Sequence, residues 1–120
     1  NVYAIGDIAN EDHPRLGRRI RVEHWDNAIE QGKAVAGNLM GGHAAYDRLP
    51  YFYTDQYDLG MEYVGAAQAG DDVEIVGDVD GLNFRAYWVA DGIVTAAMHV
   101  NDWDAIDSLR AAVGEPYASV

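Results

Sequence analysis

The sequence predicts an α+β fold, in which an antiparallel β-sheet is covered on one face by helix. After Pro50 the chain alternates apolar and polar residues at the two-residue period of a strand, and residues 102–113 return to the 3.6-residue period of a helix. The dipeptide Asp91-Gly92 between two apolar runs is the preferred sequence of a two-residue type I′ hairpin. We find no internal repeat, low-complexity segment or long linker.

Composition limits the classes of function. The chain has 120 residues, 49% of them hydrophobic, which is enough for one modest core or for a small domain plus a fragment of a second. No apolar run approaches the roughly 20 residues of a membrane span. The absence of Cys excludes a disulfide, a thiolate nucleophile or a Cys-based metal site, and it suits the cytoplasm. A formal charge of −12 disfavours nucleic acid and anionic membranes, and we expect no metal site.

The first candidate site is an apolar run that ends in Gly6-Asp7. Residues 1–5 are typical of a buried strand, and because the run starts in mid-strand without an initiator Met, we expect a C-terminal piece of a larger protein. Gly6 would let another group approach the backbone, and the Asp7 carboxylate would accept hydrogen bonds from hydroxyls. A simple turn is the alternative.

Positive charge is concentrated just after this run. Four of the eight basic residues fall within seven positions: Arg15, Arg18, Arg19 and Arg21. Pro14 and Gly17 predict a loop here, so the arginines should face solvent or a partner. Two interpretations remain open, a solvated loop that offsets Asp12 and Glu23 and a docking surface for an acidic partner.

A helix is predicted from Asn27 to the pair Gly41-Gly42. Its apolar residues follow the helical period, Asn27 and Glu30 resemble a capping box, and the glycine pair ends it. The turn before it contains His24 and Trp25. The free N–H groups of the helix start could hold an electron-rich ring or an anion, or the two side chains could simply pack the helix onto the preceding strand.

The second half begins after a connection over residues 43–50. Residues 51–57 contain four aromatics, and strand patterns follow at 61–65, 73–77, 82–90 and 93–100. The last helix is expected over 102–113, with Asn101 or Asp102 as its cap. We therefore predict two parts, 1–48 and 49–120.

Three segments together resemble the C-terminal third of the FAD-dependent ferredoxin and rubredoxin reductases, a putidaredoxin reductase-like family of the pyridine nucleotide-disulfide oxidoreductase superfamily. The segments are Val2-Tyr3-Ala4-Ile5-Gly6-Asp7, Val22-Glu23-His24-Trp25-Asp26-Asn27-Ala28 with Glu30-Gln31, and Pro50-Tyr51-Phe52-Tyr53-Thr54-Asp55-Gln56-Tyr57-Asp58-Leu59. Their order and spacing match along essentially the whole chain. The resemblance implies that residues 1–48 are the end of an FAD-binding α/β domain, in the form strand, loop and helix, and that 49–120 form the reductase C-terminal domain.

The resemblance also implies roles for individual residues. Asp7, after Gly6, would hydrogen-bond the ribityl chain of FAD, and Trp25 would contact the isoalloxazine through its backbone, with Glu23 and His24 along the same edge. Tyr53 stands where the family usually has Trp, beside the flavin. Lys33 matches a basic helix position that the family uses to dock ferredoxin.

The expected activity is that of an NADH- or NADPH-dependent reductase that passes electrons through FAD to an acidic iron–sulfur protein. No Gly-rich dinucleotide fingerprint is present, so we expect this chain alone to be inactive and not to retain FAD. No catalytic side chain is predicted, because the cofactor performs the chemistry. The alternatives are a non-catalytic interaction module, with homodimerisation possible, and a flavoprotein similar to NADH oxidase or apoptosis-inducing factor without a ferredoxin partner.

Overall fold

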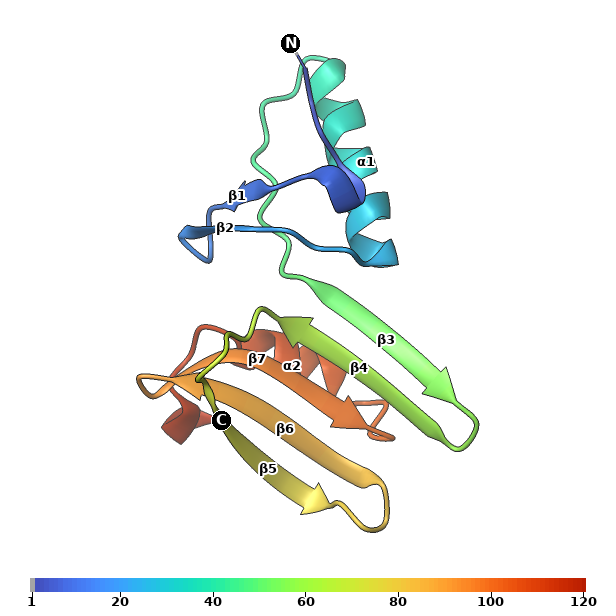
Figure 1. Ribbon diagram of the computed structural model, residues 1–120, viewed down its shortest axis with the longest axis vertical. Helices are drawn as coiled ribbons and strands as arrows, with labels where there is room; N and C mark the ends of the chain where they lie inside the picture. Colours follow the sequence, from blue (N-terminus) through green and yellow to red (C-terminus); the bar gives the residue numbers. More distant parts are fainter. Residues whose placement is uncertain (1) are drawn as a thin grey trace. The chain divides into compact units, whose positions relative to one another are not determined.

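The computed structural model describes residues 2–120, which form two compact units (Figure 1). The first unit ends at Pro50, and the second is Tyr51–Val120. The division falls at the proline that marks the change from connection to strand pattern in the sequence. We describe each unit by itself.

The first unit combines a two-stranded sheet with one long helix. In chain order it contains the 3₁₀ turn η1 (Gly6–Ile8), strands β1 (Glu11–His13) and β2 (Arg18–Ile20), and helix α1 (Trp25–Leu39). β1 and β2 pair antiparallel, and η1 packs against α1. Its buried apolar side chains are Ala9, Ile20, Val22 and Leu49.

Two expectations for this unit were wrong. Residues 2–5 do not form a strand, because none of residues 2–120 pairs with them, and their apolar side chains are exposed, Val2 at 98%. The arginine-rich segment is also not simply a loop. The tight turn at Pro14–Gly17 joins β1 to β2, so that Arg18 and Arg19 lie on a strand.

Helix α1 begins two residues earlier than predicted. Its N-cap is His24, and Asn27 lies inside the helix with its side chain buried, so the proposed capping box does not form. The predicted end is confirmed. Gly41 has φ +98° and donates to the carbonyl of Asn38, while Gly42 donates to the carbonyl of Gly37, the hydrogen bonds of a Schellman motif.

The second unit is a five-stranded antiparallel sheet with a short helix. Its elements are β3 (Tyr51–Gln56), β4 (Leu59–Gly65), β5 (Asp72–Asp78), β6 (Asn83–Ala90), β7 (Ile93–Val100), α2 (Ile106–Ala112) and the 3₁₀ turn η2 (Tyr117–Ser119). The strand order is β3-β4-β7-β6-β5, and α2 packs against β7 and β4 (Figure 1). This confirms the predicted α+β class, with the aromatic segment 51–57 providing a fifth strand.

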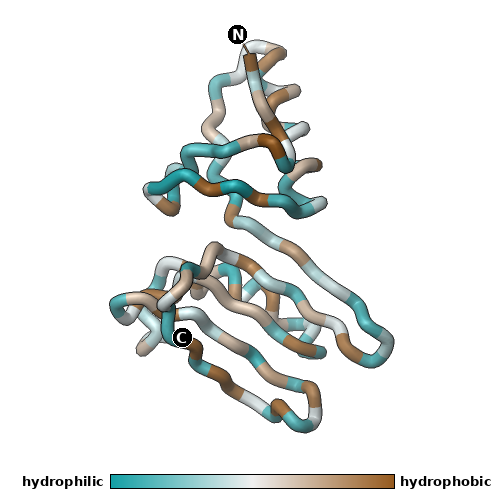
Figure 2. The backbone as a smooth tube through the Cα atoms, viewed as in Figure 1, coloured by the Kyte–Doolittle hydropathy of each residue, from teal (hydrophilic) through white to brown (hydrophobic). Residues whose placement is uncertain are grey.

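The two faces of this sheet differ. Figure 2 shows hydrophobic and hydrophilic residues interspersed along its strands. On one face Tyr63 stacks on Phe52 at 4.7 Å between ring centroids and meets Trp88 edge-on at 5.4 Å. On the other face, which α2 covers, the buried His99 shares a hydrogen bond of 2.7 Å with Glu62. The register thus places the cluster of Phe52, Tyr63 and Trp88 on the face opposite the His99–Glu62 pair.

The β6–β7 hairpin confirms the turn prediction. Asp91 and Gly92 both have positive φ, 50° and 78°, as a type I′ turn requires. Burial along β6 is less regular than predicted. Ala86 and Tyr87 point to opposite faces yet both are buried, since the ring of Tyr117 lies 5.6 Å from that of Tyr87.

Asn101 does not cap the last helix. Helix α2 starts at Ile106 without a side-chain cap, and the Asn101 side chain instead links loops that are distant in sequence. Its Oδ1 accepts from the Gly60 N–H at 2.7 Å, and its Nδ2 lies 3.0 Å from the carbonyl oxygens of Asp58 and of Leu82. Since one amide satisfies three backbone groups, Asn101 holds the β3–β4 turn and the β5–β6 loop to the end of β7.

We therefore expect Asn101→Ala to lower the free energy of unfolding by about 2–4 kcal/mol, because several hydrogen bonds of about 1 kcal/mol each are lost together. The matched control is Asn83→Ala, which removes one exposed hydrogen bond to the Asn101 carbonyl and should cost about 1 kcal/mol or less. Urea denaturation measures both. Equal losses in the two variants would contradict the linking role of Asn101.

Candidate functional site

The Gly6-Asp7 turn is held by two side chains that the sequence did not place there. Gly6 adopts φ +70°, which favours glycine, and its N–H donates to Gln31 Oε1 at 2.8 Å. The Asp7 carbonyl accepts from Arg21 Nη1 at 2.8 Å. Within residues 2–120 no hydrogen bond or ion pair engages the exposed Asp7 carboxylate, which leaves both of its oxygens available as acceptors.

The start of α1 is the second part of the candidate site. His24 precedes the helix without a side-chain cap, so the first N–H groups of α1 keep their capacity to donate. Trp25 is 71% exposed, and Glu23 beside it is also exposed. The Trp25 side chain therefore does not pack the helix onto a preceding strand, whereas His24 is half-buried.

These two parts belong to the same unit and lie along the same helix. Gln31, which holds Gly6, comes from α1, and a Cβ added at Gly6 would lie 3.8 Å from Ala28 Cβ on that helix. The structure thus brings the Gly6-Asp7 turn to the N-terminal half of α1. Tyr53 belongs to the other unit, on β3, where its side chain is 51% exposed.

The predicted docking residues fall into distinct settings. Arg15 lies in the exposed β1–β2 turn, Arg19 is exposed on β2, and Arg18 on the same strand is half-buried. Lys33 on α1 is exposed and pairs with Glu30 at 2.6 Å. Arg21 donates from its guanidinium to the Asp7 carbonyl.

Sequence reasoning missed the buried amides of α1. Gln31 and Asn27 are 5% and 3% exposed and lie four residues apart, hence on one helix face. Asn27 Nδ2 donates to the Val22 carbonyl, and its Oδ1 accepts from the Tyr46 hydroxyl. Burial, with the nearby charge of Glu11, raises the pKa of Tyr46 to about 12. The sequence signal for these buried amides is the presence of two amide side chains four residues apart on one face of the helix.

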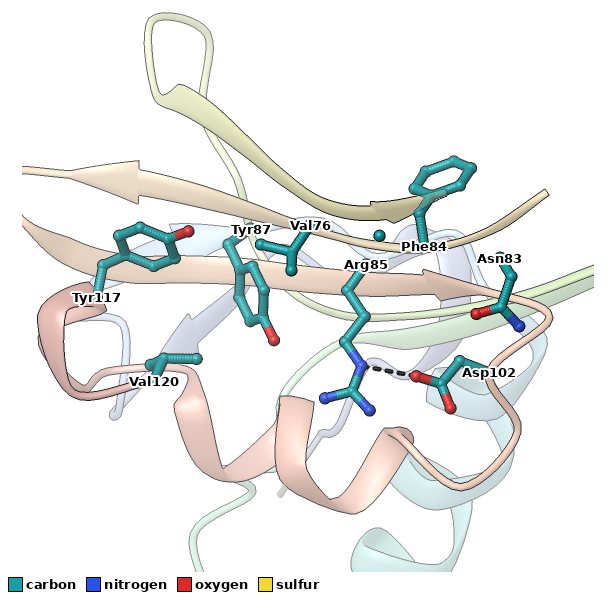
Figure 3. A pocket seen from close by; sticks show the side chains of 9 residues that line it. Val76, Asn83, Phe84, Arg85, Tyr87, Asp102, Tyr117 and Val120 are labelled. Carbon is teal, nitrogen blue, oxygen red and sulfur yellow. Dashed lines mark hydrogen bonds and ion pairs between the residues drawn. The ribbon is translucent and has the colours of Figure 1, made fainter. Parts of the chain in front are cut away.

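The second unit carries a hollow of about 340 Å³ beside β6 (Figure 3). Arg85 and Tyr87 project into it from the strand, and Asp102 accepts a hydrogen bond from Arg85 Nε at 2.7 Å, which raises the pKa of Arg85. None of the residues predicted to bind cofactor or partner lines this hollow.

Residues 2–120 contain no group of three or more His, Asp or Glu side chains arranged to hold a metal ion. No helix in this part of the chain is long and apolar enough to cross a membrane.

The comparisons with known proteins agree with one another. Residues 51–117 match the family described as Reductase C-terminal. The 5,5′-dehydrodivanillate O-demethylase ferredoxin reductase subunit of Sphingobium sp. is 39% identical over 84% of this chain and 25% of its own length. Apoptosis-inducing factor 3 of Mus musculus is 32% identical over 98% of this chain and 19% of its own.

A solved structure has the same fold. The ferredoxin reductase for the CYP199A2 system from Rhodopseudomonas palustris superposes with a TM-score of 0.80 at 33% identity, over 93% of this chain and 29% of that one. The chain therefore spans about a quarter of the length of the curated relatives that it matches.

The exposure of Trp25 predicts that Trp25→Ala changes the free energy of unfolding by less than about 0.5 kcal/mol, because little contact area is lost. Leu49→Ala, at a buried position of the same unit, should cost about 2–5 kcal/mol. Chemical denaturation of both variants tests this. A Trp25→Ala loss as large as that of Leu49→Ala would make Trp25 a core residue.

Proposed function

The chain belongs to the Reductase C-terminal family, and we propose that it works as part of an NADH- or NADPH-dependent FAD flavoprotein that reduces a ferredoxin or rubredoxin. The observation that carries this proposal is the Gly6-Asp7 turn beside α1, with an acceptor carboxylate that no described residue engages. The similarity of 84% of the chain to a ferredoxin reductase subunit supports it. We also propose that the protein works in the cytoplasm.

The residues present fit a flavin. FAD carries hydroxyls on its ribityl chain and electron-rich atoms on its ring edge. An unpartnered carboxylate suits the first, and an uncapped helix start suits the second. When bound, FAD supplies the exchange between the two-electron hydride of nicotinamide and single electrons for the acceptor.

In this proposal Asp7 accepts a hydrogen bond from a ribityl hydroxyl. The backbone at Trp25 donates to the ring edge, which Glu23 and His24 line, and the exposed ring of Tyr53 covers the flavin where it faces the nicotinamide and the acceptor. These residues bind, orient and exclude water, and no side chain of this chain moves a proton. The 120 residues alone are expected neither to retain FAD nor to be active.

The acceptor is proposed to dock on positive charge. With a formal charge of −12 the chain as a whole repels an acidic protein, so the arginine-rich β1–β2 turn with Lys33 is where such a partner would be attracted. We assign this role to Arg15, Arg18, Arg19 and Lys33. Arg21 is left out because it binds the Asp7 carbonyl.

A second candidate function is a flavoprotein of the apoptosis-inducing-factor type without a ferredoxin partner. The 32% identity to apoptosis-inducing factor 3 over nearly the whole chain favours it. The clustered arginines favour the ferredoxin reductase. A non-catalytic module that mediates homodimerisation is the remaining alternative.

The proposed cofactor contact is tested with Asp7→Ala in the complete protein. Flavin retention should weaken by about 1.5–3 kcal/mol, the contribution of a hydrogen bond to a charged group, while flavin reduction by NAD(P)H stays near the parent rate. Asp12→Ala, an exposed carboxylate on β1, is the control and should retain FAD normally. Unchanged retention with slowed reduction in Asp7→Ala would contradict the assignment.

The docking surface is tested by neutralising Arg18 and Arg19 together, or Lys33. The association rate with an acidic ferredoxin should fall and lose much of its salt dependence, because exposed charges steer encounter over the screening length of roughly 8 Å at about 0.15 M salt. Stopped-flow kinetics at several salt concentrations measure this, and reduction of a neutral quinone is the control. Equal losses with ferredoxin and quinone would show that the patch is structural.

A further inference from the structure

We propose that Gln31 and Arg21 are positioning residues, which hold the Gly6-Asp7 turn from its two sides and thereby set how tightly the protein retains FAD. The inference rests on the proposed function for the role of Asp7. It adds two residues whose side chains touch the backbone of the turn rather than the cofactor. Both contacts lie within the first unit.

Gln31 has only one way to place its amide. It is 5% exposed, and its Nε2 lies 2.7 Å from Glu11 Oε2. A carboxylate oxygen accepts but does not donate, so the NH₂ group must face Glu11 and the carbonyl oxygen must face Gly6. The other carboxylate oxygen, Glu11 Oε1, is buried and has no partner within residues 2–120, so Gln31 supplies the one hydrogen bond that this carboxylate receives there. The acceptor for Gly6 is thus fixed by a residue on β1.

Hydrogen bonds hold the backbone of Gly6 in its turn conformation. At φ +70° it lies in the left-handed region, and the Ala9 N–H donates to its carbonyl at 2.9 Å to close η1. Gln31 binds the N–H on one side of this turn, and Arg21 binds the Asp7 carbonyl on the other. With the backbone fixed at both ends, the Cα–Cβ bond of Asp7 leaves the turn in a defined direction. Such preorganisation strengthens binding by reducing the ordering cost.

The contact with the Asp7 carbonyl distinguishes Arg21 from Arg19. Arg19 lies two residues earlier, on β2, and is exposed like Arg21, but within residues 2–120 it makes no hydrogen bond or ion pair with the turn. The pair therefore allows one arginine to be removed with the turn contact and the other without it. Both variants change the charge of the chain by the same amount.

The experiment measures FAD dissociation from the complete protein, the melting temperature of its flavin-free form, and amide hydrogen exchange of residues 2–9 in that form. Gln31→Met should speed FAD release about fivefold, the expected effect of one neutral hydrogen bond, and speed exchange at Gly6. Leu49→Ala is the stability control, because it destabilises the same unit without touching the turn. It should lower the melting temperature and leave both other readouts unchanged.

The variants Arg21→Ala and Arg19→Ala test the proposal even if Gln31→Met does not fold. Arg21→Ala should speed FAD release severalfold, whereas Arg19→Ala should not, and neither measurement involves the ferredoxin. Equal rates of FAD release from Arg21→Ala and Arg19→Ala would overturn the positioning role. So would rates of FAD release from Gln31→Met and Leu49→Ala that simply follow their melting temperatures.

Asp7→Ala separates this inference from the function on which it rests. Fast FAD release from Asp7→Ala with parent-like release from Gln31→Met and Arg21→Ala overturns the positioning role alone. Parent-like release from Asp7→Ala overturns the proposed cofactor contact. In that case faster FAD release from Gln31→Met could not result from a change at the Asp7 carboxylate, and the positioning role is overturned together with the proposed contact.

Discussion

The need to satisfy a buried amide governs the first unit. Gln31 sits on the inner face of α1 and can only be buried there if its donor and acceptor groups find partners, since an unpaired buried polar group costs about 1–3 kcal/mol. The partners come from two other segments, Gly6 in η1 and Glu11 in β1. One side chain thereby fixes the positions of three segments relative to one another. A unit with few buried apolar residues is in this way given a defined arrangement.

The second unit also depends on a side-chain amide, which connects its loops. Its sheet is stabilised by strand pairing and by packing of α2, yet its loops are gathered by the amide of Asn101. In both units an amide serves because it can donate and accept at once, and so can connect a donor on one segment to an acceptor on another.

Charge has a different part in this molecule. The acidic residues are spread along the chain, while half of the basic residues lie in one hairpin and the segment that follows it. The structure divides these arginines between two roles, because Arg21 turns to the Asp7 carbonyl while Arg15 and Arg19 remain exposed. In our proposal, a surface for an acidic partner and a support for the candidate cofactor site thus come from one short stretch of sequence.

The sequence by itself determined the α+β class, the hairpin at Asp91-Gly92 and the end of α1 at Gly41-Gly42, because turn chemistry and periodicity are local properties. It also determined the family, through motifs whose order and spacing need no coordinates. Only the tertiary structure decided that residues 2–5 are not a strand, since pairing depends on a neighbour, and that Asn27 and Asn101 cap no helix. It likewise decided which backbone groups Gln31 and Arg21 contact. Their contacts with Gly6 and Asp7 join residues 25 and 14 positions apart, and such contacts follow from how segments pack rather than from any pattern along the chain.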